Sequence, residues 1–464
     1  MKITRVAALI AATGLVVSGL ALSGCSGAAS SGGGTTTLRI SANSVKGGKN
    51  TAKAEWISDY VIPKFKELER SKGKKVDVRF EGTGVDDAPF KQKTALDLKT
   101  GAAADLIEID GIWVGEFAQA GYIKPLDQTV GVSAGHWEGW RQIPAPVQAI
   151  MSFNGQRYGL PTGTDGRVLF YNKKLFAQAG LPTDWQPKSW DDVIAAGQKL
   201  TALKGVTPIQ LNAGTAMTEA TTMQGVLPLL VGTGQEIYQN GKWQGATPQM
   251  RDVLDLYKKV YSTGLGDPKL QQNPQGRDES FTRFSKNEVG MLLESDYFWR
   301  EVVGPTAEVA PMKDRDQTVG YTLIPAMRPG GGVRGQSQVS MSGGVGWVIN
   351  PRTKNAALAW DLLTFMQGHD AVKEEVRRTA VGISPRNDVN AETLTGDPLL
   401  RFIATKVLPI TSVRPGLAAY PQVSTALQKA TGDVVAGESV DQAAKSYERN
   451  LEQAVGGAGA VRTR

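Results

Sequence analysis

Residues 104–126 read ADLIEIDGIWVGEFAQAGYIKPL, and the order of apolar residues in this stretch decides the fold class. Residues 104–109 form an apolar run with the length of a buried parallel strand. Residues 113–120 have helical spacing, and Gly121 follows where such a helix would end. A strand, a turn and a helix in this order make one unit of an α/β fold.

The same rhythm occurs on the N-terminal side of this stretch. Residues 38–41 and 76–80 favour strands, and residues 53–71 and 89–100 favour helices. Connections between parallel strands are almost always right-handed crossovers, which these helices can supply. We therefore expect an α/β protein with mostly parallel sheets.

Residues 1–24 have the pattern of an export signal. Lys2 and Arg5 give the positive start, residues 7–22 give the apolar core, and small residues end it at Leu22-Ser23-Gly24-Cys25. This tetrapeptide resembles the lipobox of bacterial lipoproteins, in which the cysteine accepts a diacylglycerol before cleavage ahead of it. We expect residues 1–24 to be a signal peptide.

Cys25 is the only cysteine in the chain. An exported protein with one thiol cannot form an internal disulfide, and lipidation gives that thiol a role. Residues 26–37 are almost all Ser, Gly, Ala and Thr, which favours a flexible tether. We expect residues 25–37 to be a lipid-anchored tether that holds the protein outside the cytoplasm on the cell membrane.

The composition is typical of a globular protein. Of 464 residues, 41% are hydrophobic and 21% are charged, and the length suits two or three domains of about 150 residues. The net charge is +7, but the basic residues are dispersed. Their densest group, Lys72, Lys74 and Lys75, lies near Glu67 and Glu69. We expect a monomer that has no nucleic-acid partner.

Enzyme motifs are absent or stand in the wrong context. Residues 330–335 match GxGxxG, but Pro329 precedes them and polar residues follow, which favours a loop over a dinucleotide site. His136 and His369 are the only histidines, and neither has a cysteine partner after lipidation. This argues against a zinc site and a histidine-based triad. We expect no catalytic residue, no metal and no cofactor.

Several segments resemble the family 1 extracellular solute-binding proteins, which include maltose- and trehalose-binding proteins. Each segment is weak alone, but the ordered series spans nearly the whole mature chain. The segments are residues 104–126, 158–161, 169–176, 179–182 and 189–192, then Gly343-Gly344 before a strand, and Arg414-Pro415 ahead of Tyr420.

This resemblance implies a two-lobed fold of the type II periplasmic-binding-protein kind, with a hinge of several chain crossings between the lobes. A solute would bind in the cleft and close it. The expected division is residues 38–167 plus 348–408 for the first lobe, residues 168–347 plus 409–455 for the second, and a disordered tail at residues 456–464.

A sugar presents many hydroxyl groups, so its site needs carboxylates and other polar groups. Asp110 follows a strand at its carboxyl end, where α/β proteins bind ligands and where the family has a sugar-contacting carboxylate. Asp165 lies in a turn-rich loop before a crossing strand, and Arg414 matches a family position that faces the cleft. Gly343 and Gly344 would let backbone N–H groups approach the solute. The alternatives are a helix cap for Asp110, an Asx turn for Asp165, a surface ion pair for Arg414 and a simple bend at the glycines.

A sugar also presents apolar C–H faces, which aromatic rings cover. Trp113 is either a stacking platform or a residue that packs a helix on the sheet. Asp296, Tyr297 and Trp299 occupy a stretch in which relatives often carry a stacking aromatic residue. We expect one of the two rings to be a platform, the other to lie in the core, and Asp296 to contact the solute.

The sequence therefore predicts the solute-binding subunit of an ABC transporter, not an enzyme. This subunit would capture an oligosaccharide, about the size of a disaccharide, and deliver it to membrane permease subunits. Two alternatives stay open. One is a binder of a glycerophosphodiester or another polyol or anion. The other is a secreted carbohydrate-active hydrolase that uses Asp110 and a partner carboxylate.

Overall fold

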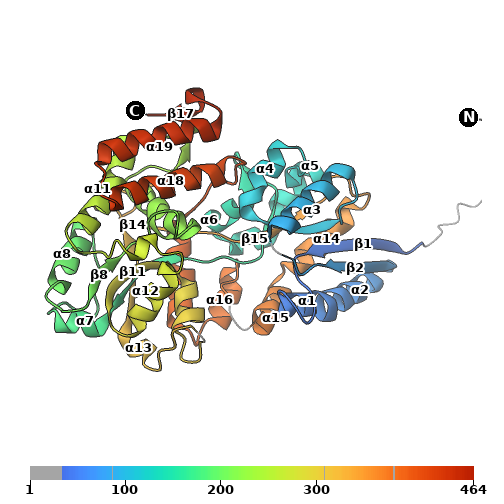
Figure 1. Cartoon of the computed structure of the whole chain (residues 1–464). Coiled ribbons are helices and arrows are strands. Elements are labelled where there is room, and N and C mark those ends of the chain that lie inside the picture. The colour runs from blue at the N-terminus through green and yellow to red at the C-terminus, as the bar shows by residue number, and fades with distance from the viewer. Residues whose placement is uncertain (1–33, 86, 308, 380–381, 464) are drawn as a thin grey trace, which may run out of the picture.

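The computed structural model describes residues 34–463 apart from residues 86, 308, 380 and 381, and it has two lobes (Figure 1). The signal peptide 1–24, Cys25 and the tether up to residue 33 lie outside the described residues. Within the described part of the chain, no helix is both long and apolar enough to cross a membrane.

The first lobe is built on a five-stranded mixed sheet. Its strands, in order across the sheet, are β2 (Val76–Gly82), β1 (Thr36–Ala42), β3 (Leu106–Asp110), β15 (Val345–Ile349) and β6 (Gly159–Pro161). β1 pairs in parallel with β2 and β3, as the sequence predicts. β15 returns from the other lobe and therefore runs antiparallel to β3 and β6.

Helices pack on this sheet. Trp56 is fully buried and donates its indole N–H to the backbone oxygen of Ala371 at 2.9 Å, which joins two of the helices. The main helices are α1 (Thr51–Trp56), α2 (Ile62–Ser71), α3 (Asp87–Thr100), α4 (Val114–Gln119), α14 (Ala356–Met366) and α15 (His369–Thr379).

The second lobe is built on a four-stranded mixed sheet. Its strands, in order, are β12 (Val319–Thr322), β7 (Arg167–Asn172), β11 (Val289–Ser295) and β8 (Thr207–Gln210). β8 and β11 are parallel, whereas β7 runs antiparallel to both of its neighbours. All six residues of β7 are buried because both faces of this sheet are covered.

Three of the main helices of the second lobe begin at capping hydroxyls, namely α8 (Trp190–Leu200), α11 (Pro248–Ser262) and α19 (Val440–Val455). Ser189 accepts a hydrogen bond from the Asp192 N–H, and Thr247 accepts one from the Met250 N–H. The other main helices are α12 (Gly276–Ser285) and α18 (Tyr420–Val435).

The α/β class and the two-lobed fold are confirmed, but three predicted boundaries are wrong. β1 already pairs with β2 at Thr36, so the tether is shorter than predicted. All of β15 belongs to the first sheet, including Val345–Trp347, which the prediction assigned to the second lobe. The tail is ordered, because β17 (Val461–Arg462) satisfies its backbone groups by pairing with β10 (Lys242–Gln244).

The segment before residue 408 also differs from the prediction. Phe402 packs on Tyr321 of the second lobe with ring centroids 5.3 Å apart. Asp397 accepts a hydrogen bond from the indole of Trp299 at 3.2 Å. Apolar packing therefore holds residues 397–402 against the second lobe, although the prediction placed them in the first.

The core of the first lobe contains a buried charged cluster. Lys53 of α1 forms an ion pair with Glu108 of β3, and Glu375 of α15 lies close enough to interact with both. Burial raises the pKa of Glu375 to about 7, with Glu108 adding to the shift and Lys53 opposing it. The carboxyl of Glu375 is only 8% exposed, so it titrates inside the fold.

Glu375→Gln should change how stability depends on pH. Between pH 4.5 and about 7 the folded carboxyl keeps a proton that the unfolded chain releases, so the free energy of unfolding falls as pH rises through this range. The fall should amount to about 2–3 kcal/mol, and it should be absent in Glu375→Gln. Urea unfolding at several pH values measures it.

Glu374→Gln is the matched control for this experiment. Hydrogen bonds from Arg377 and Arg378 lower the pKa of Glu374 to about 2. Its contribution to stability is therefore present above about pH 4.5 and is lost as pH falls towards 2, which is the opposite sign. Identical pH profiles for the wild type and Glu375→Gln between pH 5 and 8 would refute the assignment.

Candidate functional site

The chain crosses between the lobes at places that hydrogen bonds tie together. Two short crossings are residues 162–166, between β6 and β7, and residues 343–344, between β14 (Gln338–Ser342) and β15. The Ser342 hydroxyl donates to the backbone oxygen of Asp165 at 2.6 Å, and the Gly343 N–H donates to Oδ1 of Asp165 at 2.7 Å. Thr411 of a further crossing donates to the Ser342 hydroxyl at 2.8 Å.

Asp165 is the charged centre of these crossings. Its Oδ1 also accepts a hydrogen bond from Arg167, which is 6% exposed and donates a second bond to the Met341 oxygen at 3.2 Å. Burial alone would raise the pKa of Asp165, but Arg167, the Gly343 N–H and Arg414 outweigh it and hold the pKa below its ordinary value. The carboxylate is therefore charged, and its side chain is still 34% exposed.

Asp296 does not reach the cleft. It is 1% exposed, its Oδ1 accepts from the Gly166 N–H at 3.0 Å, and its Oδ2 accepts from Nε of Arg300 at 2.8 Å. Burial raises its pKa, and the neighbouring charge of Asp165 adds to the shift. The prediction that Asp296 contacts a solute is wrong, because the side chain braces the first crossing from inside.

Arg414 is held by a group of second-lobe residues that the sequence did not single out. Its Nη1 donates to Oε1 of Glu219 at 2.9 Å. The same carboxylate accepts from the Tyr420 hydroxyl and the Ser424 hydroxyl, each at 2.6 Å. Nε of Arg414 is buried and has no hydrogen-bond partner among the described residues. The guanidinium is thus anchored at one end and has donor capacity left at the other.

Backbone strain occurs directly before Glu219. Thr218 has φ 49° and ψ −135°, a conformation that is unfavourable for a β-branched residue. Such strain persists only where the surroundings impose it, and it is common at binding sites. Here it sets the start of the helical segment Glu219–Thr221 and with it the position of the Glu219 carboxylate.

Asp110 caps the segment that follows β3. Its Oδ1 accepts a hydrogen bond from the Ile112 N–H at 3.0 Å, which is the helix-cap alternative. Asp110 also lies near enough to Arg414 for its charge to favour the protonated guanidinium. The two side chains share a small hollow of about 10 Å³. Its lining residues are Asp110, Gly111, Ile112, Ile150, Ser342, Gly343, Gly344, Val413 and Arg414.

The two glycines differ in what they offer to this hollow. The Gly343 N–H is taken by Asp165 and is therefore not available to a solute. A Cβ on Gly344 would come within 2.2 Å of the Gly163 oxygen, and the Gly344 oxygen accepts a hydrogen bond from the Gly111 N–H at 3.0 Å. Close backbone packing between crossings thus requires a glycine at position 344, and solute contact through the Gly344 N–H stays a prediction.

The aromatic candidates separate into core and surface. Trp299 is 1% exposed, bonds Asp397 and has the guanidinium of Arg315 3.7 Å from its ring centroid. Trp113 is 7% exposed and packs between Phe90 and Phe117. For Trp113 this favours the alternative in which the residue packs a helix on the sheet, and for Trp299 it matches the expectation that one of the two rings in its stretch lies in the core.

Tyr297 has the opposite environment. It is 40% exposed, and the Arg277 guanidinium lies 5.7 Å from its ring centroid. Arg277 is itself fixed by two hydrogen bonds of 2.8 Å to the Glu294 carboxylate. Of the two aromatic residues in this stretch, Tyr297 is therefore the one that can still serve as a platform.

A larger pocket of about 210 Å³, here called the interlobe pocket, adjoins the small hollow. It shares Gly111, Ile150, Val413 and Arg414 with the hollow, and its other walls come from both lobes. Burial raises the pKa of Glu236 in this pocket, while Arg334 and a hydrogen bond from Ser412 oppose the shift. Its lining includes Phe153, Asn154, Glu236, Tyr238, Met341 and Leu417.

Sequence reasoning missed Glu219 and the role of Tyr420. Glu219 belongs to no periodic pattern, and it meets Arg414 from a position 195 residues earlier in the chain. No spacing rule connects residues so far apart. Among the residues that the structure describes, no cluster of His, Cys, Asp and Glu could hold a metal ion.

Glu219→Ala should destabilise the second lobe. It leaves the mostly buried Arg414 and Tyr420 without their shared acceptor, which should lower the free energy of unfolding by about 2–3 kcal/mol in urea denaturation. Glu138→Ala is the control, because Glu138 pairs with Arg141 on the surface, where both side chains are more than 70% exposed. The control should change stability by less than about 0.5 kcal/mol. Equal effects of the two substitutions would contradict the assignment.

Known proteins with similar sequences and structures share the fold of this chain. A putative binding protein of Brucella abortus is 28% identical over 276 residues, which are 59% of this chain and 61% of the relative, so the match spans less than two thirds of that relative. The sugar-binding protein MalE of Xanthomonas citri superposes with a TM-score of 0.72 at 16% identity, over 91% of this chain and 98% of MalE. The cyclic α-maltosyl-1,6-maltose binding protein of Arthrobacter globiformis superposes with a TM-score of 0.70 at 18% identity, over 91% of this chain and 99% of that protein. The family model of the bacterial extracellular solute-binding proteins matches residues 48–373, and this chain belongs to that family.

Proposed function

We propose that this protein captures a carbohydrate between its lobes and delivers it to the permease of an ABC importer. The observation that carries the proposal is the meeting of Arg414, Asp110 and Asp165 at the lobe crossings. A guanidinium with unused donors beside carboxylates can bind hydroxyl groups, which both accept and donate hydrogen bonds. The family and the sugar-binding structural neighbours support the same ligand class.

The crossings suggest how binding changes the shape of the molecule. A solute that contacts Asp110 from the first lobe and the Glu219–Arg414 group of the second favours the closed arrangement of the lobes. Residues 162–166 and 343–344 are short enough to act as the hinge between packed lobes. Tyr297 is our candidate for the ring that covers an apolar sugar face. The closed form then docks on the permease.

We further propose that binding proceeds without hydrolysis. A glycoside hydrolase needs two accessible carboxyl groups on either side of the scissile bond. Asp296 is buried and bonded to Arg300, and Asp165 is bonded to Arg167. Asp110 is the only carboxylate among the described residues that line the small hollow.

Lipidation at Cys25 is part of the same proposal. β1 is the first strand of the described residues, and it starts at the end of the first lobe that lies far from the second lobe (Figure 1). The chain from Cys25 to Thr36 could extend about 40 Å at most. A lipid-anchored tether of this length lets the protein stay near the permease while its lobes open and close.

Thermal unfolding of the protein without residues 1–25 should identify the solute. The panel contains mono- and disaccharides, maltodextrins, xylo- and cello-oligosaccharides, and glycerophosphodiesters. A ligand at one hundred times its Kd should stabilise the fold by about 2.7 kcal/mol and raise Tm by a few degrees. We expect a shift with one carbohydrate class, and chromatography should recover the sugar intact.

Matched arginine variants test the site in the same assay. Arg414→Ala should remove the part of the shift that comes from the interlobe site, whereas Arg141→Ala should retain the full shift, because Arg141 lies on the surface of the first lobe. A shift only with glycerophosphodiesters would replace the carbohydrate by that ligand. Cleavage of the sugar during incubation would instead establish a hydrolase.

The lipid anchor has a separate test in cells. Full-length protein should sediment with membranes and incorporate radiolabelled palmitate, and Cys25→Ser should abolish the labelling and release the protein. Release should leave Tm unchanged, since Cys25 precedes the described fold. Labelling that persists in Cys25→Ser would exclude this cysteine as the anchor.

A further inference from the structure

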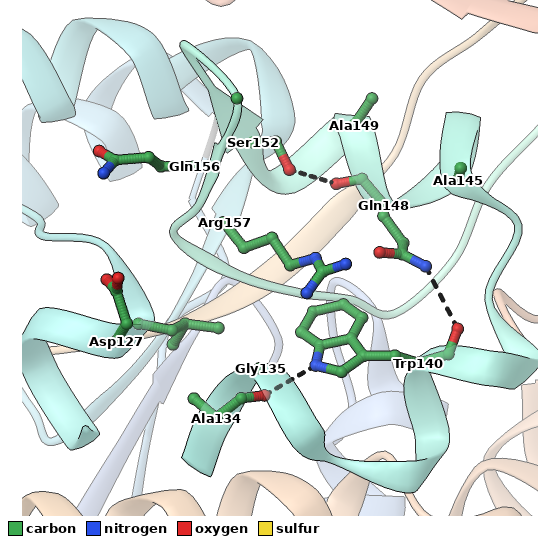
Figure 2. A pocket seen from close by; sticks show the side chains of 12 residues that line it. Asp127, Ala134, Gly135, Trp140, Ala145, Gln148, Ala149, Ser152, Gln156 and Arg157 are labelled. Carbon is green, nitrogen blue, oxygen red and sulfur yellow. Dashed lines mark hydrogen bonds between the residues drawn. The ribbon is translucent and has the colours of Figure 1, made fainter. Parts of the chain in front are cut away.

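A second hollow of about 440 Å³ lies on the first lobe (Figure 2). Its walls come from α5 (Leu126–Val130), α6 (Ala145–Gln148) and the hairpin of β4 (Ser152–Phe153) and β5 (Gln156–Arg157). It contains none of the residues proposed above to hold the solute, and it shares only Ala149 and Ser152 with the interlobe pocket. Its volume is in the range of small-molecule sites. We call it the Trp140 hollow.

Arg157 is held in this hollow without a charged partner. Its guanidinium lies against the Trp140 ring (Figure 2), and the guanidinium carbon is 4.3 Å from the ring centroid. Trp140 is fixed in turn, because its indole N–H donates to the Ala134 oxygen at 2.8 Å and Trp137 packs edge-on at 5.6 Å. The Arg157 side chain makes no hydrogen bond or ion pair with any described residue. Its N–H donors are therefore oriented and unused.

Hydrogen-bond acceptors without partners line the same hollow. The Gln148 amide N–H₂ donates to the backbone oxygens of Trp140 at 3.2 Å and Ile143 at 2.8 Å, which leaves its side-chain oxygen free to accept. The Asp127 carboxylate forms no ion pair within the described residues. The Ser152 hydroxyl donates to the Gln148 backbone oxygen at 2.8 Å and can still accept a bond.

Small residues keep the space between these groups open. A Cβ placed on Gly135 or on Gly155 would meet no atom within 4 Å. Leu126, Gln156 and the methyl groups of alanines form the remaining walls, and the apolar ones can contact the C–H groups of a ligand. The small wall residues are Ala134, Gly135, Ala145, Ala149 and Gly155.

We propose that the Trp140 hollow is a second binding site and that it takes a neutral polyhydroxyl ligand, a saccharide unit. Arg157 requires acceptors, whereas Asp127 and Gln148 require donors, and a hydroxyl group supplies both. The charges of Arg157 and Asp127 cancel. A ligand with only a carboxylate or only an ammonium group would therefore leave one of these two side chains without a partner. The site lies outside the lobe crossings and does not depend on the solute bound there.

Saturation-transfer NMR tests this site with maltotetraose, cellotetraose and arabinotetraose as probes. Arg414→Ala removes the proposed interlobe contact, so the signal that remains reports other sites. We expect one probe to give signal with Arg414→Ala, and this signal should fall at least fivefold in Arg414→Ala/Arg157→Ala. Adding Arg141→Ala instead should leave it unchanged, because Arg141 is an exposed arginine of the neighbouring segment that does not line the hollow. Circular dichroism and Tm confirm that each variant is folded.

The outcomes separate this proposal from the proposed function. A thermal shift that is undiminished in Arg414→Ala would overturn the interlobe assignment, and the hollow is then judged from Arg157→Ala in the wild-type background. Absence of any signal that depends on Arg157 would overturn the second site. Binding of glucuronate alone, with no neutral sugar, would overturn the neutral ligand class.

Discussion

The hydrogen bonds around Asp165 join the segments of the chain that cross between the two lobes. Its carboxylate accepts from Arg167 on one crossing and from the Gly343 N–H on another, and Ser342 extends the set to Thr411. These crossings contain buried backbone N–H and C=O groups. Beyond the ends of the sheets, each of these groups needs a hydrogen-bond partner outside the strand ladders. A charged acceptor at their meeting point satisfies several donors at once and fixes where the lobes can pivot.

The binding chemistry depends on the same region. Arg414 follows the crossing that contains Thr411, and its guanidinium donates a hydrogen bond to Glu219. The charges of Asp110 and Asp165 lie close to this guanidinium. Anchoring one edge of a guanidinium reduces the entropy lost when its other edge meets a ligand. The strained backbone at Thr218 belongs to this arrangement, since it sets the carboxylate that holds the arginine.

Side chains with the chemistry of sugar binding can have structural roles instead. Asp296, Trp299 and Trp113 have the chemistry of sugar-binding side chains, yet the fold uses them to brace a crossing or to fill the core. Carboxylates and indoles satisfy buried polar groups as well as they bind sugars, so residue type does not distinguish the two uses. The exposed fraction of the side chain does distinguish them. It depends on packing against segments distant in sequence, as it does for Trp299, which donates a hydrogen bond to Asp397.

The sequence by itself determined the α/β class, the pattern of an export signal before Cys25 and the family, because all of these depend on neighbouring residues or on ordered motifs. Only the tertiary structure decided that Asp110 caps the segment after β3, that Glu219 meets Arg414 and Tyr420, that Tyr297 rather than Trp299 is exposed, and that Arg157 lies unpaired over Trp140. Local periodicity specifies strands and helices, whereas a site is formed by contacts between residues as many as 205 positions apart, and those contacts exist only once the lobes have packed.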